Sequence, residues 1–348
     1  MSSIAVVGAG AVTPVGLNAV ETAFSHRAAA AGMREAPLVD ARGEAITMCF
    51  LPTLDPLLTG AERAFALASR ALEEALQSVA PLAASQPRAR VVVAVDEPLA
   101  VKTPGEQAPP EQLGRELRQV ARKRVPSIDV EIVPRGPAGP GYALPALKEA
   151  LTSGELDFAV LGGVHTDYDL RRIAALDAAG RLFRPDNLDA LIPGEAAAFA
   201  VLMSADLARR LRLRERARIH ASATAFERAR PTNDESAFQA VGLTAALRTG
   251  LDALGTRAGW VLTDVTFETF RHFELQAALT RTQRSLCEPH HVESPAQRLG
   301  YLGAAAVPLH LVLASEAFHR GFAPHRLCVS IAGSDNGERS VVLLSEPA

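Results

Sequence analysis

The residues best suited to chemistry form one short run, Cys287-Glu288-Pro289-His290-His291, which combines a thiol, a carboxylate and two imidazoles. Such groups hold zinc only when three or four of them converge on one point. Adjacent histidines on an extended chain point to opposite sides, and the sequence contains no second cluster. We therefore expect a polar loop without a metal. A reactive thiol needs a nearby cation, and His290 and His291 are close to Cys287 in the sequence. Cys287 is therefore the best candidate nucleophile.

A second place for chemistry is the stretch 134–141, which separates an expected strand from an expected helix. Enzymes often place a nucleophile there, because helix N-terminal amides stabilise developing negative charge. This stretch has three prolines and three glycines but no Cys, Ser, Thr or Lys, so its side chains cannot carry out covalent catalysis.

A dinucleotide site is not expected at the opening Gly8-Ala9-Gly10, because Thr13 stands where the fingerprint needs its third glycine. The chain also contains no G-x-S-x-G, H-E-x-x-H or P-loop pattern. The sequence therefore predicts no cofactor.

The composition fits a globular protein, with 348 residues, 48% hydrophobic and 22% charged. This length corresponds to roughly two domains, or to one large domain built from two halves. The net charge of -3 gives no general attraction for nucleic acid or an anionic membrane. The odd number of cysteines, three, argues against a disulfide framework. The N-terminus lacks the basic region of a signal peptide, and Pro308 interrupts the apolar stretch 299–314, so we expect a cytoplasmic protein without a membrane span.

Short apolar runs alternate along the chain with helical patterns, which predicts an α/β fold with a largely parallel sheet. The seam between two halves is expected at Met203-Ser204, where Ser204 can cap the following helix. In the helix expected over 61–79, the apolar stripe should be buried, and Arg63 should face away from it. The expected strands are 4–7, 91–95, 130–133, 158–161, 261–265, 327–331 and 341–344; the other expected helices are 142–151, 205–213, 237–254, 273–284 and 304–318.

Four segments resemble β-ketoacyl synthases of the thiolase-fold superfamily, and they keep that family's order from residue 4 to about residue 344. They are the opening strand and turn 4–16, the segment Gly154 to Gly163, the Pro193-Gly194-Glu195-Ala196-Ala197-Ala198 element, and the segment Leu299 to Ala305. The resemblance implies a layered α/β/α/β/α fold made of two similar halves, 1–203 and 204–348.

The resemblance also shows which catalytic groups are missing. The position of the family's acyl-accepting cysteine falls on Pro137, and Tyr301 stands at the position of its second histidine. The region of the first histidine lacks the family's H-G-T-G-T pattern, and His272 is a displaced counterpart. A proline cannot act as a nucleophile, and a tyrosine is a poor substitute for imidazole near neutral pH.

The resemblance therefore implies a catalytically inactive ketosynthase-like protein that acts as a binding or scaffold subunit. One version is a chain-length-factor-like partner of an active synthase. The other is an adaptor, like the degenerate proteins found beside type VI secretion genes. The alternative is an acyltransferase or condensing enzyme of the fatty-acid or polyketide type that uses a non-standard nucleophile, for which Cys287 is the candidate.

The expected partners are a second copy or a ketosynthase-like subunit, and an acyl carrier protein or a secretion-apparatus protein. The family's two-fold interface would here involve residues near 137–144 and 157–164. His165, Asp167 and Glu195 could line a residual cleft, or could instead be hydrogen-bonding groups at strand ends. If Glu195 is buried, its carboxylate must be paired, because burying an unpaired charge is costly.

Overall fold

The computed structural model describes residues 3–97, 109–230 and 239–347. Ten strands form one sheet, in the order β10-β9-β11-β12-β8-β1-β7-β6-β4-β5. Their bounds are β1 (Ile4–Val12), β4 (Ala89–Ala94), β5 (Asp129–Val133), β6 (Phe158–Thr166), β7 (Glu195–Ser204), β8 (Ala217–Phe226), β9 (Ala258–Thr263), β10 (Leu286–Glu293), β11 (Leu327–Gly333) and β12 (Glu338–Ser345). The helices described are α1 (Ala19–Arg27), α2 (Gly60–Gln77), α3 (Pro109–Arg122), α4 (Gly139–Ser153), α5 (Leu170–Ala178), α6 (Ala205–Arg210), α7 (Val241–Asp252), α8 (Thr269–Thr282), α9 (Ala296–Leu299) and α10 (Ala306–Arg320).

The sheet contains the same five-strand arrangement twice. Within the first five strands the order is β5-β4-β6-β7-β1, and the last five repeat it as β10-β9-β11-β12-β8. The two sets meet where Ile4–Val6 of β1 pair antiparallel with residues 217–219 of β8. Ser204 caps α6 next to this junction, as the sequence predicts, by accepting a hydrogen bond from the Leu207 N–H at 3.3 Å.

The sheet is mixed, which corrects the expectation of a largely parallel one. Among the described strands, the parallel pairs are β4 with β5 and with β6, and their counterparts, β9 with β10 and with β11. The strands nearer the junction pair antiparallel. In the second half this follows from a short turn at 334–337 between β11 and β12, since a tight turn can join only antiparallel strands.

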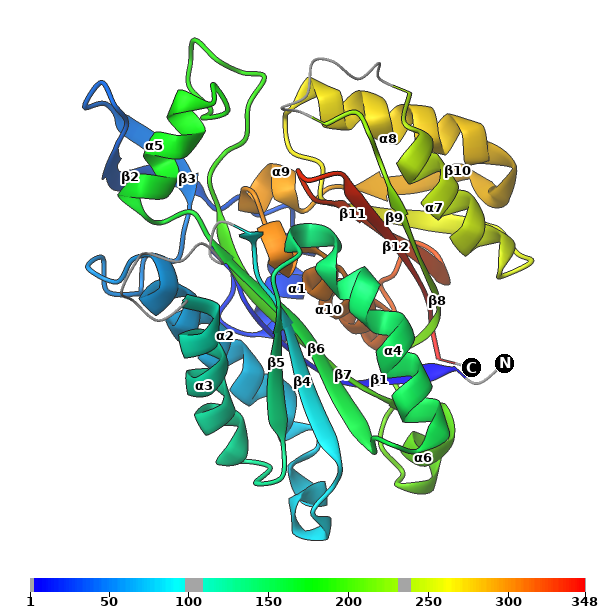
Figure 1. Ribbon diagram of the computed structural model, residues 1–348. Coiled ribbons are helices and arrows are strands. Elements are labelled where there is room, and N and C mark those ends of the chain that lie inside the picture. Colours follow the sequence, from blue (N-terminus) through cyan, green and yellow to red (C-terminus); the bar gives the residue numbers. More distant parts are fainter. Residues whose placement is uncertain (1–2, 98–108, 231–238, 348) are drawn as a thin grey trace.

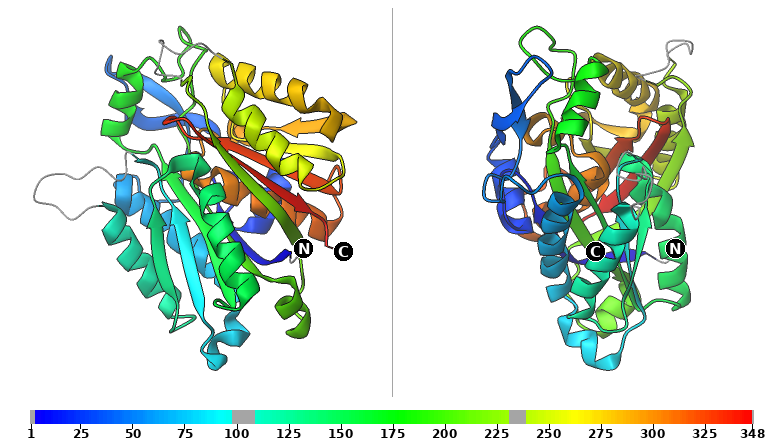
Figure 2. Two further views of the ribbon diagram at one scale, coloured as in Figure 1. Left: turned by 45° about the vertical axis from the view of Figure 1, so that its right-hand side comes forward. Right: turned by 60° about the vertical axis from the view of Figure 1, so that its left-hand side comes forward.

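Helices form three layers around the two sets of strands (Figures 1 and 2). α4 and α10 lie between the sets and contact strands of both. α2 and α3 cover the outer face of the first set, and α7 and α8 cover the second. Residues 306–317 of α10 are all buried, as expected for a helix enclosed on every side. The layers therefore run α/β/α/β/α.

α2 shows how the core deals with one charged residue. Its apolar stripe from Ala64 to Leu76 is buried as predicted, but Arg63 is also buried, at 1% exposure, and does not face solvent. Its guanidinium pairs with the Glu195 carboxylate, with Nε–Oε2 at 2.6 Å and Nη2–Oε1 at 2.9 Å. Glu195 also accepts hydrogen bonds from the Leu51 N–H and the Thr166 hydroxyl. The prediction that a buried Glu195 is paired is confirmed.

Two expectations about exposed segments are wrong. Residues 287–291 lie in β10, which borders one edge of the sheet, so their polarity reflects an edge strand and not a loop. The strand 157–164, expected at a dimer interface, is the interior strand β6 and is paired on both sides within its own chain. The free edge of the first set is β5 instead.

A small unit covers one end of the sheet. β2 (Met33–Val39) and β3 (Ala45–Cys49) form a separate two-stranded sheet, and Figure 1 shows it beside α5. Their buried side chains cluster with Tyr168 and Tyr301. No helix among the described residues is both long and apolar enough to cross a membrane.

Candidate functional site

The loop before α4 contains Pro137, in a single 3-10 turn over Gly136–Ala138 that is buried throughout. Ser334, in the turn after β11, fixes this loop. Its hydroxyl accepts a hydrogen bond from the Ala138 N–H at 3.1 Å and donates one to the Arg135 carbonyl at 2.6 Å. The Ala138 amide at the start of α4 is therefore already bonded within the chain.

Tyr301 lies at the same junction, before the η5 turn (Gly303–Ala305), which packs against the Pro137 turn. Its ring meets His165 edge-on, with centroids 4.9 Å apart and an interplanar angle of 86°. Burial, together with the negative charges of Asp335 and Asp96, raises the pKa of Tyr301 well above its usual value. The phenol therefore stays protonated at physiological pH.

His165, at the end of β6, is held between two carboxylates. Its Nδ1 bonds to the Asp96 carboxylate, and its Nε2 lies 3.0 Å from Asp167 Oδ2. Burial disfavours the cation, but the charges of Asp167 and Asp96 outweigh burial and raise the pKa of His165 to about 10. The ring is thus an imidazolium at neutral pH, which has no lone pair to accept a proton.

Asp167 is held by further donors. Arg172 Nε donates to Oδ1 at 2.8 Å, and the Gly194 N–H donates to Oδ2 at 3.1 Å. Burial would raise the pKa of Asp167, but His165 and Arg172 outweigh it and keep the pKa below its usual value. Of the two readings left open for His165 and Asp167, the hydrogen-bonding role at a strand end is the one observed.

A second group of ion pairs ties together the loops of the other half. Arg181 lies between Glu268, at 2.6 Å, and Asp335, also at 2.6 Å. Arg271 pairs with Asp264 at 3.2 Å and also donates to the Gly333 carbonyl. The cavity beside Asp264, Arg271 and Gly333 measures about 10 Å³, room for no more than one water molecule.

The proposed counterpart of the first histidine does not join this group. His272 follows Arg271 on α8 and is only half-buried, whereas Arg271 is buried and reaches the turn after β11. The loops thus bring Pro137 and Tyr301 to one junction. The residue of α8 that reaches the loops there is Arg271, and not His272.

Cys287 lies elsewhere, on the edge strand β10. Its half-exposed thiol sits 3.4 Å from Nε2 of His325, and not against His290 or His291 as their closeness in sequence suggested. His290 instead bonds to the Cys287 carbonyl, and His291 to Glu293. His325 Nδ1 is itself in contact with Leu327, at 3.1 Å from the backbone nitrogen and 3.3 Å from the carbonyl oxygen.

Sequence reasoning did not single out Asp96, Arg172, Arg181 or Asp335 for this junction. One signal was available: Asp96 directly follows the strand run 91–95, and parallel strands bring their C-terminal ends to one edge of a sheet. No group of three or more His, Cys, Asp or Glu side chains within the described ranges is arranged to hold a metal ion.

No family model and no curated protein matches the sequence. Solved structures do match the whole chain. An ishigamide ketosynthase/chain length factor aligns with a TM-score of 0.80 at 19% identity, covering 100% of both chains. A type II polyketide acyl-carrier protein in complex with its ketosynthase gives 0.81 at 16%, over 99% of this chain and 100% of the other. A β-ketoacyl synthase from Burkholderia phymatum STM815 gives 0.77 at 17%, over 100% of both. These matches confirm the predicted thiolase-like ketosynthase fold.

Proposed function

We propose that this protein is a ketosynthase-like subunit that does not catalyse condensation and acts by binding a partner. The loop before α4 carries this proposal. Pro137 occupies the position that the resemblance assigns to the acyl-accepting cysteine, and the stretch 134–141 contains no side chain that could replace that thiol. The Ala138 amide is bonded to Ser334, so it is not free to stabilise charge on a bound acyl group.

The surrounding groups support the same conclusion. A condensing enzyme needs a base or acid whose pKa lies near the working pH. The pKa of His165 is about 10, and the pKa of Tyr301 is raised well above its usual value. Both groups keep their protons at neutral pH, and His165 is held by carboxylates on both ring nitrogens. The junction is built to hold loops together.

For the partner, we favour the chain-length-factor-like version, paired with an active synthase. Its support is the full-length match to a structure described as a ketosynthase/chain length factor. The match to a ketosynthase bound by its acyl-carrier protein supports such a carrier as a further partner. No observation on this chain favours the secretion-adaptor version over this one.

The enzymatic alternative rests on one observation, the contact between Cys287 and His325. The Cys287 thiol also donates a hydrogen bond to the Arg257 carbonyl, with Sγ and O 3.7 Å apart. A thiol that donates to a carbonyl keeps its proton, so this contact favours a hydrogen-bonded thiol over an activated nucleophile.

The test is intact-mass analysis after incubation with malonyl- and acyl-loaded acyl carrier protein. We expect no covalent adduct on the chain and no condensation product, whereas an intact ketosynthase treated alongside becomes acylated. A Cys287→Ala variant locates any adduct that does form. Acylation of the wild-type chain that disappears in Cys287→Ala would establish the enzymatic alternative.

A further inference from the structure

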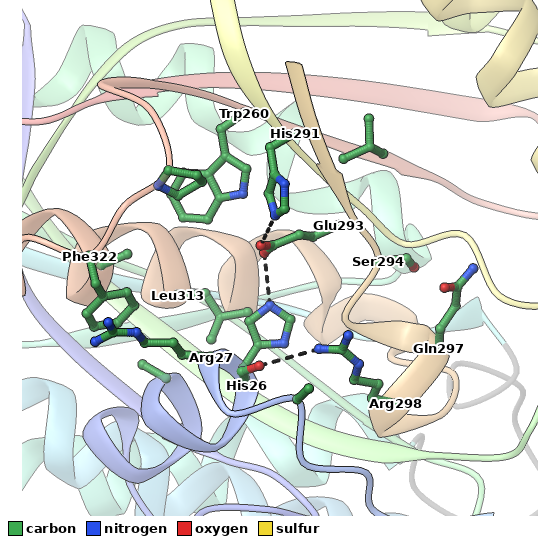
Figure 3. A pocket seen from close by; sticks show the side chains of 15 residues that line it. His26, Arg27, Trp260, His291, Glu293, Ser294, Gln297, Arg298, Leu313 and Phe322 are labelled. Atoms are coloured by element: carbon green, nitrogen blue, oxygen red, sulfur yellow. Dashed lines mark hydrogen bonds and ion pairs between the residues drawn. The ribbon is translucent and has the colours of Figure 1, made fainter. Parts of the chain in front are cut away.

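A pocket of about 500 Å³ lies apart from the junction of Pro137 and Tyr301. Figure 3 shows side chains from the end of α1, from β9 and β10, from α9 and from α10 converging on it. Small-molecule sites in proteins typically measure about 300–1,000 Å³. The volume is therefore sufficient for a compact organic molecule.

The acidic group in this pocket is already engaged. Glu293 bonds to Nε2 of His26 at 3.1 Å and to Nε2 of His291 at 2.5 Å. Burial would raise the pKa of Glu293, but the bonds and charges of the two histidines outweigh it and lower the pKa. The carboxylate is therefore ionised at neutral pH, and both of its oxygens have partners.

The basic groups, by contrast, are in excess. Arg27 and Arg298 both line the pocket, and neither forms an ion pair with a carboxylate of the described chain. Arg298 Nη1 lies 3.5 Å from the His26 carbonyl, and the Arg27 guanidinium lies 4.7 Å from the centre of the Phe322 ring. Two guanidinium groups against one carboxylate leave the lining positive even with both histidines neutral.

The rest of the lining combines apolar side chains with the polar Ser294 and Gln297. Trp260, on β9, Phe322, after α10, and Leu313, on α10, form its apolar part (Figure 3). Trp260 is 2% exposed, so the edge of its ring borders the pocket, and Arg27 lies over the Phe322 ring. Trp260 Nε1 and His26 Nδ1 are buried without a hydrogen-bond partner among the residues described. Unpaired buried polar atoms are rare in proteins, and these two belong to residues of the pocket wall.

We propose that this pocket binds a small organic anion, namely a carboxylate with a flat apolar body. Its carboxylate pairs with the Arg298 guanidinium, and its body packs against Trp260 and Phe322. A planar guanidinium matches a carboxylate in two-point geometry, and an aromatic wall favours a ring over a flexible chain. This site is independent of the proposed partner-binding function and survives its failure.

The test uses 3-phenylpropionate as the probe and its uncharged amide, 3-phenylpropionamide, as the matched compound. Calorimetry on the full chain gives the Kd of each. Trp260 is the single tryptophan of the chain, so its fluorescence emission reports whether the probe binds in this pocket. We expect the acid to bind, to change the Trp260 emission, and to bind more tightly than the amide.

Substitutions of single arginines then test whether the charge of the pocket determines the affinity for the acid. Arg298→Ala should raise the Kd of the acid about tenfold, the expected result of losing one charge-assisted hydrogen bond, with little effect on the amide. Arg298→Lys should restore part of the affinity. Arg70→Ala, an exposed arginine on α2, is the control and should leave both Kd values unchanged. Equal binding of acid and amide, no binding at millimolar concentration, or an unchanged Kd in Arg298→Ala would each overturn the proposal.

Discussion

Two fully buried histidines hold opposite charge states in this fold because of what surrounds them. His165 lies between two carboxylates and has a pKa of about 10. His310, on α10, bonds to the Ser330 hydroxyl at 2.9 Å, and burial together with the charge of His26 lowers its pKa to about 3. At about pH 8, nitrogen-15 NMR should show both His165 nitrogens protonated and His310 neutral. A neutral imidazole at His165 would contradict the carboxylate clamp.

The same two shifts predict how stability depends on pH. The pKa of His165 is raised in the folded state, so its contribution is complete below about pH 6.5 and is lost as the pH rises toward about 10. The pKa of His310 is lowered, so its contribution is complete above about pH 6.5 and is lost as the pH falls toward about 3. Thermal unfolding of the wild-type chain should therefore show a falling Tm from pH 7 to 10. In His165→Gln, which cannot titrate there, the decline should be smaller, and an equal decline in both would refute this account.

The Arg63–Glu195 pair predicts a large effect from a single substitution. Glu195→Ala removes the carboxylate that pairs with Arg63 and leaves a guanidinium buried at 1% exposure. Breaking a buried pair in this way costs about 3–5 kcal/mol of unfolding free energy. The matched control is Asp206→Ala, which breaks the exposed pair with Arg209 and should cost less than about 1 kcal/mol. Denaturant unfolding of both variants measures the difference, and similar losses would mean that the buried pair has no special role.

Among the elements, buried strands and strongly patterned helices were predictable from the sequence. The apolar runs in β1, β4, β6, β9 and β11 predicted these strands because both of their faces are covered. β10 was mistaken for a loop because an edge strand is exposed on one side and tolerates polar residues. The antiparallel strands were not foreseen, since the direction of a strand depends on its connections.

The junction of Pro137 and Tyr301 was only partly predictable, because it too depends on contacts between distant segments. Pro137 and Tyr301 were placed by resemblance, and the structure brings them together. The ion pairs that join the loops connect Asp96 to His165 and Arg181 to Asp335, which lie far apart in the sequence. Pairing of this kind is decided by the tertiary arrangement, and no local pattern in the sequence encodes it.

Close packing of α4 on β12 gives a prediction for a glycine. A Cβ at Gly141 would lie 2.4 Å from Ser340 Cβ, a backbone-anchored atom that cannot move aside. Gly141→Ala should therefore cost about 1–3 kcal/mol despite the higher helix propensity of alanine. Gly250 on α7 is the control, because its nearest neighbour is the flexible end of Leu343, at 3.0 Å. Gly250→Ala should be close to neutral in thermal unfolding, and equal effects of the two would contradict the packing argument.

At the scale of the whole molecule, the two halves are joined through more than one layer. The pairing of β1 with β8 links the strands, and α4 and α10 fill the space between the two sets. Within the described ranges, the free edges of the sheet are therefore β5 and β10. An unpaired strand edge offers its backbone groups to another chain, so any self-association through the sheet should use one of these two strands.

β5 is the better candidate for a two-fold contact. A hollow of about 400 Å³ lies between α3 and β5 and is lined in part by Val130, Ile132 and Pro134. Glu111, Arg115 and Arg118 also line it, so the hollow combines an apolar part with a charged rim. This pattern suits a protein interface, which should bury more than about 2,000 Å² if it is obligate. We predict a dimer through β5, either with a second copy or with an intact synthase.

Light scattering at micromolar concentration measures the mass of the wild-type chain and of two variants. Ile132→Lys places a charge in the β5 hollow and should convert the dimer to a monomer, because an unpaired charge at an apolar interface is costly. Phe273→Lys replaces an exposed aromatic residue on α8, on the outer face of the other half, and should leave the mass unchanged. A wild-type chain that is monomeric alone but dimeric when co-expressed with a synthase restricts β5 to the mixed pair. If Ile132→Lys leaves the dimer intact, β5 is not the interface, and the remaining free edge, β10, becomes the strand to test.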